Sequence, residues 1–473
     1  MKVLFIHPAS GVLEFSSKDF IKTGALLPPL GLLYLAGMLE KNGYEAEILD
    51  CNSEEISENK IKKIIRSFDA VGMTIYSEEY EQKNSRLISD IIRESDSEIP
   101  IIIGGAHCTL LPEQSLIDHK ADICVQGRGD SLIVPIVEAL MGKKDLSSIP
   151  NIYFRKGKKI HYTKSAKIDL KLDELPYPAR HLVDKYDYGF LHGQRIAKGR
   201  LTSIITSRGC AYRCNFCNLH AHIPELELRS SENILKEIED ISNKGYKTLV
   251  FVDDNFISRK KLVIEVMDYI IKQKLDLRLW IWEARIDAAD RSLFEKMRDA
   301  GTEAINFGIE SGCQEILDYY NKKITIQQIK DAVSLSKEMG FLVTATFIIG
   351  SPIETKKHIK KTIKFSSSLP LDSAIFYLFQ YTYKSKFWED CVKQGKIRTD
   401  EFRVIPDIRR GLGNFTSEEL MNFTRIAYIN FFMNPSRWLR TCKVVLKFKD
   451  KRTFFQGLQI TKQIMIGKSF KFN

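Results

Sequence analysis

Residues 207–217 read Ser-Arg-Gly-Cys-Ala-Tyr-Arg-Cys-Asn-Phe-Cys, so that Cys210, Cys214 and Cys217 form a C-x3-C-x2-C pattern with Phe216 before the last cysteine. This spacing fits neither an extended strand nor one face of a helix, and it suits a loop wrapped around a compact group. Cysteine thiolates are the usual ligands of iron–sulfur clusters. A cubane has four irons, so three cysteines leave one iron open to a small molecule.

A zinc site is the alternative interpretation of these cysteines. A structural zinc ion needs a fourth Cys or His, and His220 and His222 are near enough in the sequence to supply one. Segments further along the chain, described below, favour the cluster.

Size and composition limit the class of protein. A chain of 473 residues, 44% of them hydrophobic, can form two or three domains with large cores. No apolar run reaches the length of a transmembrane helix, and the N-terminus reads as a first strand rather than a signal peptide. The nine cysteines are mostly scattered, which argues against a disulfide framework and for a reducing compartment. We therefore expect a cytoplasmic protein.

Residues 1–143 alternate short apolar runs with helical patterns. The runs occupy residues 3–6, 46–49, 70–75, 100–103 and 123–125. Such alternation predicts a parallel sheet covered on both faces. Five units suggest a doubly wound, flavodoxin-like (Rossmann-type) domain that binds its ligand outside the carboxyl ends of the strands.

The rest of the chain is expected to form a linker, a barrel and an extension. Residues 144–198 read as the linker, because a polar, proline-punctuated segment lies within them. Residues 199–385 read as the barrel and 386–473 as a mostly helical extension. The strand candidates of the barrel are residues 202–206, 248–252, 277–282, 303–309, 342–349 and 373–379. Six such units fit an incomplete (β/α)6 barrel of the TIM type, with its chemistry at the carboxyl ends of the strands.

Polar residues and glycines stand where these strands end. Asp253 and Asp254 close the second strand, and two acids there are more plausible at a polar site than in a core, although Asp254 or Asn255 could instead cap a helix. Arg285 follows the third strand and can pair with a carboxylate. Glu310 ends the fourth strand between two glycines, and Gly350 ends the fifth.

The cysteine pattern and these segments together resemble the radical S-adenosylmethionine (SAM) superfamily over about residues 200–380. In that family the open iron chelates SAM, and one-electron reduction cleaves SAM to a 5′-deoxyadenosyl radical. The resemblance implies that Cys210, Cys214 and Cys217 are the catalytic cluster ligands. It also implies SAM contacts at Phe216, Asp253, Asp254, Arg285, Glu310 and Gly350.

Loops of the first domain carry a second resemblance, to the cobalamin-binding domain that precedes many radical SAM domains. The segments are Pro28-Pro29-Leu30-Gly31, Gly104-Gly105-Ala106-His107 and Gly127-Arg128-Gly129-Asp130. The implied cobalamin contacts are Pro29, Gly31, Thr74, Gly104, Gly105, His107 and Gly127. Cobalamin is thus a third expected cofactor; a flavodoxin-like domain kept only for docking is the alternative.

The first domain also departs from the family pattern. Ala106 stands where the family usually has proline, and Arg128 and Asp130 stand where it usually has glutamates. The D-x-H-x-x-G motif of proteins whose histidine binds cobalt is absent. We therefore expect no cobalt-bound histidine through that motif.

The charge of the chain is uneven. The formal net charge is +11, and the last forty or so residues are rich in Lys and Arg. Trp438, Phe454 and Phe455 lie among these basic residues, a mixture that could contact an anionic membrane peripherally. A helical cap with a solvated basic face is the favoured alternative. No nucleic-acid module is recognisable, so no nucleic-acid partner is expected.

The resemblances imply an enzyme with a [4Fe-4S] cluster, SAM and cobalamin that transfers a methyl group to an unactivated C–H position. The first alternative is an oxidoreductase or cyclase of the same family without methyl transfer. The second is a cluster-bearing binding or sensor protein without turnover. The expected partners are a small-molecule or lipid substrate and an electron donor such as flavodoxin or ferredoxin. Nothing in the sequence identifies the substrate.

Overall fold

The computed structural model describes residues 1–10, 26–54, 56–76, 79–191 and 194–434. The chain divides into two compact units, Met1–Leu201 and Thr202–Asn473. Within the described residues, no helix combines the length and apolarity needed to cross a membrane.

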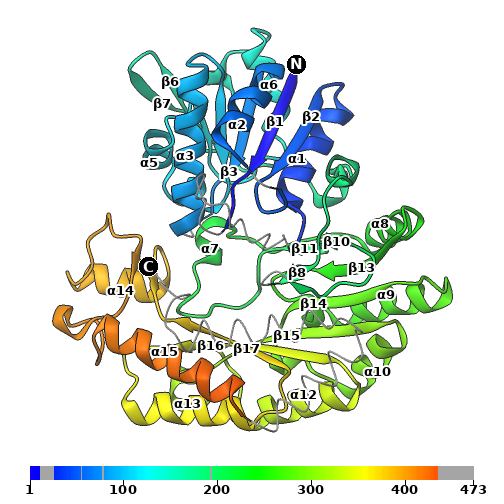
Figure 1. The fold of residues 1–473 in the computed structure, drawn as a ribbon, viewed down its shortest axis with the longest axis vertical. Helices are drawn as coiled ribbons and strands as arrows, with labels where there is room; N and C mark the ends of the chain where they lie inside the picture. The colour runs from blue at the N-terminus through cyan, green and yellow to red at the C-terminus, as the bar shows by residue number, and fades with distance from the viewer. Residues whose placement is uncertain (11–25, 55, 77–78, 192–193, 435–473) are drawn as a thin grey trace. The chain divides into compact units, whose positions relative to one another are not determined.

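Five parallel strands form the centre of the first unit, in the order β2-β1-β3-β4-β5; Figure 1 labels the first three of them, β1, β2 and β3. They are β1 (Lys2–His7), β2 (Glu45–Asp50), β3 (Ala70–Thr74), β4 (Ile101–Gly104) and β5 (Ile123–Val125). The helices of this unit are α1 (Leu30–Lys41), α2 (Glu58–Ile64), α3 (Glu79–Ser95), α4 (Ala106–Leu110), α5 (Pro112–Asp118) and α6 (Ile133–Leu140).

Both faces of this sheet are covered. Leu4 and Ile6 of β1 belong to a core that includes Ile88 of α3, whereas Val3 and Phe5 alternate with them and are also at most 1% exposed. Successive side chains of a strand point to opposite faces, so apolar residues at every position require cover on both sides. The predicted flavodoxin-like fold class is confirmed.

Two antiparallel strands extend the sheet within the expected linker. β6 (Ile152–Lys156) pairs with β5, and β7 (Lys159–Tyr162) pairs with β6. Ile152 and Phe154 of β6 are buried while the residues between and after them are not. Such short half-buried strands carry a weak sequence signal, and the sequence analysis did not anticipate them. The sheet is therefore mixed rather than purely parallel.

Six strands form the sheet of the second unit in sequential order. They are β10 (Arg200–Ile204), β13 (Tyr246–Phe251), β14 (Arg278–Ala284), β15 (Thr302–Glu310), β16 (Leu342–Ile349) and β17 (Ser373–Leu378). The pairs from β13 to β17 are parallel. Each strand begins within two residues of the range expected from the sequence, which confirms the partial barrel.

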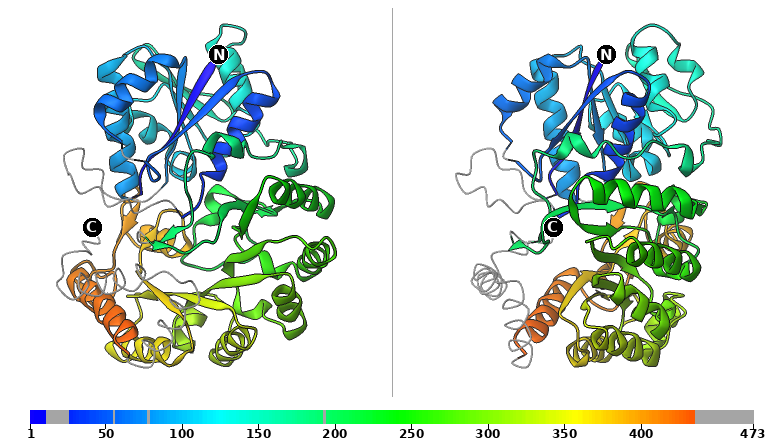
Figure 2. Two further views of the ribbon diagram at one scale, coloured as in Figure 1. Left: turned by 45° about the vertical axis from the view of Figure 1, so that its right-hand side comes forward. Right: turned by 90° about the vertical axis from the view of Figure 1, so that its right-hand side faces the viewer.

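Helices lie along the outer side of this sheet (Figure 2). The main ones are α8 (Ser231–Asn243), α9 (Lys260–Lys272), α10 (Arg291–Asp299), α12 (Ile326–Glu338) and α13 (Lys356–Ser368). Val343, Ala345 and Phe347 of β16 pack into the hydrophobic core shared with these helices. Thr344 and Thr346 alternate with them and therefore point to the inner face of the barrel.

The described part of the C-terminal extension contains α14 (Lys386–Lys393) and α15 (Ser417–Phe432). Helix α15 begins with a capping box formed by Thr416 and Glu419, and its Phe431 packs edge-on against Phe376 of β17. The basic segment with Trp438, Phe454 and Phe455 lies outside the described residues. Its membrane contact therefore stays a prediction.

Candidate functional site

The cysteine loop follows β11 (Ser207–Arg208) at the carboxyl end of the first barrel strand. Backbone and amide groups attach it to the segment after α11 (Gln314–Tyr319). The Asn215 amide nitrogen donates to the Tyr320 carbonyl (2.9 Å), and its side chain donates to the Tyr319 carbonyl (2.8 Å). Asn321 Nδ2 donates in return to the Arg213 carbonyl (2.7 Å). These bonds hold the three cysteines in one partly exposed loop.

Phe216 contributes to the same attachment. Its ring meets the buried ring of Tyr320 edge-on at a centroid distance of 5.1 Å, a favourable geometry for aromatic pairs. The structure therefore places Phe216 as a packing contact of the loop, and its predicted contact with SAM stays a prediction.

Arg285 places a positive charge beside the cysteine loop. Its guanidinium lies 3.6 Å from the ring centre of Tyr212, and Nη1 lies 3.9 Å from Cys214 Sγ. Nε and Nη2 donate to the two oxygens of Asp287 at 2.9 and 3.1 Å. Asp287 already provides a carboxylate partner for Arg285. The geometry therefore indicates that Arg285 stabilises the cysteine loop. Its predicted pairing with SAM stays a prediction.

Glu310 forms a buried ion pair that the sequence analysis missed. Lys322 Nζ lies 2.7 Å from Glu310 Oε1, and the two side chains are 8% and 9% exposed. Glu310 has a positive φ of 67°, and a Cβ on Gly308 would lie only 2.7 Å from Glu310 Oε1. Glycine at 308 is thus required by the close approach of the pair. Lys322 follows a helix rather than a strand, so the strand-end pattern could not identify it.

The two acids that close β13 have different surroundings. Asp253 is buried and accepts hydrogen bonds from Thr206 N, Thr206 Oγ1 and Ser207 Oγ at 2.6–3.1 Å. It therefore fixes the chain that enters the cysteine loop. Asp254 is exposed by residue surface area, although burial of its carboxyl group raises its pKa, and its predicted contact with SAM stays a prediction.

Asn255 and Trp280 add unsatisfied polar atoms at the carboxyl ends and inner face of the barrel. Within the described part of the chain, the side-chain oxygen and nitrogen of buried Asn255 have no hydrogen-bond partner. The buried indole nitrogen of Trp280 also has no partner among these residues. Trp280 alternates with the core residues Leu279 and Ile281, so its ring faces inward. Buried polar groups normally have partners, so these atoms fit a polar ligand.

Glu283 is a second residue that the sequence analysis did not single out. Burial and the neighbouring Glu310 raise the pKa of Glu283 to about 7, although Lys322 opposes the shift. No hydrogen bond or ion pair of its carboxyl group occurs among the described residues. A strand-end carboxyl with a pKa near neutrality can hold or release a proton at physiological pH.

Gly350 directly follows β16, in a conformation that requires glycine. Its φ is +99°, and a Cβ there would lie 2.9 Å from Leu420 of α15. Its amide nitrogen donates to Glu354 Oε2 at 2.7 Å. Glu354 is fully buried, and burial raises its pKa to about 7. Gly350 is thus fixed by packing and capping, and its predicted contact with SAM stays a prediction.

One of the two histidines considered for a zinc site, His220, contacts the backbone of the cysteine loop. His220 Nε2 lies 2.6 Å from the Tyr212 carbonyl oxygen. Among the described residues, no three His, Cys, Asp or Glu side chains surround one point as a single metal ion requires. In a cubane cluster each cysteine binds a different iron, so its ligands need not converge in this way. Three thiols in one loop, a neighbouring guanidinium and the unsatisfied Asn255 fit a [4Fe-4S] cluster that carries SAM.

The glycine loops of the first unit also meet at one edge of their sheet. The Ile75 amide nitrogen donates to the Gly104 carbonyl (2.7 Å), and the His107 amide nitrogen donates back to the Ile75 carbonyl (3.2 Å). The Gly127 amide nitrogen donates to Thr109 Oγ1 at 3.0 Å. The segments that follow β3, β4 and β5 therefore form one connected surface, and Thr74 lies at its edge.

The glycines of this surface differ in the space around their Cβ positions. A Cβ on Gly105, whose φ is +104°, would lie 2.8 Å from Thr74 Oγ1 and 2.9 Å from the Ile75 carbonyl oxygen. Gly105 is therefore required by the fold itself. Gly31 and Gly127 have no atom within 4 Å of a Cβ position, which leaves room for a bulky ligand.

Two of the three residues that depart from the family pattern, Arg128 and Asp130, pair with each other. Arg128 Nε lies 3.3 Å from Asp130 Oδ2, and Arg128 Nη1 donates to the Leu170 carbonyl at 2.8 Å. Pro29 precedes α1 as its N-cap, and Gly31 is exposed in the first turn. The open positions above these glycines fit cobalamin, and the individual contacts stay predictions.

Comparison with protein families supports both assignments. Residues 204–366 match the radical SAM superfamily, and residues 18–136 match the B12 binding domain. Together the two matches contain the cysteine loop and the glycine loops.

Curated relatives and a solved structure align with most of the chain. The chain is 29% identical over 443 residues to an uncharacterized methyltransferase, PH0819, from Pyrococcus horikoshii, covering 92% of this chain and 93% of the relative. It is 26% identical to the anaerobic magnesium-protoporphyrin IX monomethyl ester cyclase of Rubrivivax gelatinosus, covering 97% and 81%. The structure of the radical SAM methyltransferase TsrM from Kitasatospora setae, with cobalamin and a [4Fe-4S] cluster bound, superposes with a TM-score of 0.66 at 19% identity, covering 83% and 75%.

The chain belongs to the cobalamin-dependent radical SAM family, in which a B12-binding domain precedes a radical SAM domain. The cofactors of this family are a [4Fe-4S] cluster, SAM and cobalamin. The protein is therefore a cobalamin-dependent radical SAM enzyme, and its relatives include methyltransferases and cyclases.

Proposed function

We propose that this enzyme transfers a methyl group to an unactivated carbon of a small-molecule or lipid substrate. The observation that carries the proposal is the relative named a methyltransferase, which aligns with 92% of the chain, so the likeness includes both the B12-binding and the radical SAM domains. When bound, the cluster and SAM supply a carbon radical that abstracts hydrogen, and cobalamin supplies the methyl group.

The protein's own residues position these groups. Cys210, Cys214 and Cys217 hold the cluster, and Arg285 keeps their loop in place while lowering its negative charge. Asp254 and Asn255 offer an oxygen to an ammonium group and an amide to a carboxylate, the two polar groups of an amino acid.

We propose Glu283 as a proton-accepting group in the barrel. Its carboxyl lies near the Lys322–Glu310 ion pair, and its pKa of about 7 lets it take up a proton at neutral pH. We propose that Glu283 receives a proton or a hydrogen bond from the substrate. A one-electron donor such as flavodoxin or ferredoxin is proposed for reduction.

Ring formation without methyl transfer is the second candidate. It is favoured by the cyclase of Rubrivivax gelatinosus, which aligns with 97% of the chain at 26% identity. Both candidates begin with the same radical and differ in the fate of the substrate.

Methyl-deuterated SAM distinguishes the candidates. The full chain is prepared anaerobically with iron, sulfide and hydroxocobalamin, reduced, and incubated with fractionated small-molecule and lipid extracts. Methyl transfer predicts 5′-deoxyadenosine together with a product that carries the deuterated methyl group. 5′-Deoxyadenosine with only unlabelled, dehydrogenated or ring-closed product favours the second candidate.

The Cys210→Ala variant gives the background for this assay. Loss of one of three cluster ligands should abolish 5′-deoxyadenosine release. If the loaded wild-type enzyme releases no more 5′-deoxyadenosine than this variant, both catalytic candidates fail and a binding or sensor protein remains.

A further inference from the structure

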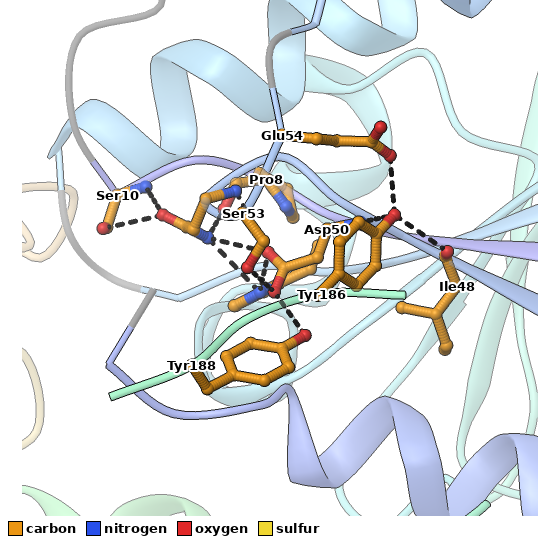
Figure 3. A network of polar contacts seen from close by, with 10 residues as sticks. Pro8, Ser10, Ile48, Asp50, Ser53, Glu54, Tyr186 and Tyr188 are labelled. Carbon is orange, nitrogen blue, oxygen red and sulfur yellow. Dashed lines mark hydrogen bonds and ion pairs between the residues drawn. The ribbon is translucent and has the colours of Figure 1, made fainter. Parts of the chain in front are cut away.

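Charged side chains of this protein are commonly paired, both in its interior and on its surface. Inside the first unit, the buried carboxylate of Asp50 accepts a hydrogen bond from Tyr188 OH (2.9 Å) and lies 3.0 Å from His7 Nδ1. Figure 3 shows Asp50 and Tyr188 within a larger polar network. On the surface of the barrel, Lys236 of α8 pairs with Glu232 at 2.7 Å. Helix α13 departs from this pattern.

Helix α13 carries five lysines on its outer side, which we call the lysine face. They are Lys356, Lys357, Lys360, Lys361 and Lys364. All five are exposed, and they fill every exposed position of residues 356–364. With 3.6 residues per turn, they lie within about 140° of one another around the helix axis. Ile359, Thr362 and Ser366 lie on the opposite side of the helix and are buried.

The lysine face does not stabilise the helix that carries it. Among the described residues, no carboxylate forms an ion pair with any of its five ammonium groups. Lys356 and Lys357 stand in the first helical turn, where the helix dipole favours acidic residues, and that turn has none. Three pairs of the lysines are four residues apart, a spacing at which like charges repel. A helix face that acts against its own stability indicates a role in binding.

Helix α11 connects α13 to the cysteine loop. Cys313, just before α11, donates from Sγ to the His358 carbonyl of α13 at 3.5 Å. At its other end, α11 leads to the carbonyls of Tyr319 and Tyr320, which accept hydrogen bonds from Asn215 of the cysteine loop. Helix α11 has six residues and is therefore about 9 Å long. The first turns of α13 are thus one short helix away from the cysteine loop.

The chemistry of the lysine face favours an acidic protein over a membrane. Within residues 356–368 no large apolar side chain is exposed, so α13 has none to insert into a bilayer. An array of like charges on a rigid helix attracts a partner of opposite charge, steers its approach and sets its orientation. Complexes between electron-transfer proteins are typically small and transient, and one helix face suffices for such a contact.

We propose that the lysine face of α13 docks an acidic one-electron carrier protein that reduces the cluster. The inference rests on the proposed radical chemistry, which requires a reduced cluster. In this step the carrier is oxidised by one electron and the cluster is reduced by one electron, and no covalent bond forms or breaks. The five lysines bind the carrier and take no part in the chemistry of the substrate.

Binding measurements test the docking directly. The full chain, reconstituted with its cluster, is titrated with purified flavodoxin and, separately, with purified ferredoxin at low and at high salt. Wild-type protein should bind at least one of these carriers, and its affinity should fall as salt screens the charges. Binding of neither carrier by folded wild-type protein overturns the proposal.

Two triple variants with the same change in charge locate the surface. Glutamine replaces lysine in both, because its helix propensity is similar, so their melting temperatures should match that of the wild type. The α13 variant combines Lys357→Gln, Lys360→Gln and Lys364→Gln. The control changes three exposed lysines in or just after α9 and combines Lys261→Gln, Lys272→Gln and Lys274→Gln.

The two variants should differ in their affinity for the carrier. At low salt the dissociation constant should rise about tenfold or more in the α13 variant and stay near the wild-type value in the control. The salt dependence of binding should also weaken in the α13 variant alone. Equal affinities of all three proteins for the carrier overturn the proposal.

The source of electrons separates this inference from the proposed function. The α13 variant should lose 5′-deoxyadenosine release driven by the carrier but keep release driven by dithionite, a small reductant that needs no docking surface. If wild-type protein releases none with dithionite, the proposed function fails, while the titrations still decide the docking. Vesicles rich in phosphatidylserine test the membrane alternative. Vesicle binding that only the α13 variant loses, without any binding of a carrier, overturns the proposal.

Discussion

The two candidate sites are built in opposite ways. Around the cysteine loop, charged side chains satisfy one another: Lys322 pairs with Glu310, Arg285 with Asp287, and Asp253 with the chain entering the loop. The glycine loops of the first unit instead present backbone and open space at Gly31 and Gly127. A site that must control charge is held by side chains fixed in advance, whereas a site that receives a bulky ring needs backbone without side chains.

The largest expected effect concerns the cysteine loop. Cys214→Ala removes one of three cluster ligands and the sulfur next to Arg285, so the reconstituted protein should lose its [4Fe-4S] cluster and all SAM cleavage. Iron analysis and 5′-deoxyadenosine assay measure this. Cys391→Ala, which changes a half-buried cysteine of the same unit outside the loop, is the matched control and should keep both. A full cluster in Cys214→Ala would remove this loop from the site.

The buried ion pair tests whether the barrel site is held by its internal charges. Lys322→Met leaves Glu310 buried without its partner, which should lower the free energy of unfolding by roughly 3–5 kcal/mol. Adding Glu310→Gln should restore much of that loss, because the unpaired charge is then gone. Denaturant unfolding of the single and double variants measures the coupling.

An exposed pair provides the control for this cycle. Arg291 and Glu338 are both about half exposed, so Arg291→Met should cost less than about 1 kcal/mol. Equal costs for Lys322→Met and Arg291→Met would contradict an organising role for the buried pair.

Most of the fold could be predicted from local sequence patterns, for physical reasons. A parallel strand buried on both faces, such as Val3–Ile6, is a continuous apolar run that stands out against its neighbours. β6 and β7 were missed because only alternate residues of β6 are buried, and their existence depends on pairing with β5. A pattern in one segment does not reveal a partner far along the chain.

The same limit explains the outcome for the site. The cluster cysteines could be predicted because the signal is their spacing within one loop. They are Cys210, Cys214 and Cys217. The Lys322–Glu310 and His7–Asp50 contacts join residues that only folding brings together. Asp253, Arg285 and Gly350 were predicted at strand ends and lie there, yet each has a structural partner that no sequence pattern indicates.

The pH dependence of stability gives a smaller effect within the barrel. Glu354 is fully buried with a pKa of about 7, above the value of 4.5 for an ordinary glutamate. The folded state then binds the proton more tightly than the unfolded state, so this group lowers stability as pH rises from about 4.5 to about 7. Glu354→Gln should remove that loss, on the order of 3 kcal/mol by pH 8.

Unfolding measured at a series of pH values tests whether Glu354 lowers the free energy of unfolding as the pH rises. Glutamine can still accept the hydrogen bonds from the amide nitrogens of Gly350 and Ser351 that Glu354 now receives. The variant should therefore match the wild type near pH 4.5 and exceed it at pH 8. Parallel stability curves for the two proteins would show that Glu354 ionises normally.

The smallest change in stability, and the sharpest test of the contrast between the two sites, is expected at Gly31. Gly105 is unsuitable for this test, because any Cβ there collides with Thr74 and Ile75. A loss of cobalamin in a Gly105 variant could therefore reflect a damaged fold. Gly31 lies in α1 with open space around it, so Gly31→Ala should be neutral or stabilise the helix by up to about 1 kcal/mol. Gly31→Leu should fold equally well but fill the space that the corrin ring requires. Gel filtration with hydroxocobalamin should show retention falling from wild type to Ala to Leu while the melting temperature stays constant. Equal retention by all three proteins would mean that the glycine is not part of the cobalamin surface, and the first unit would then lose the openness that distinguishes it from the barrel.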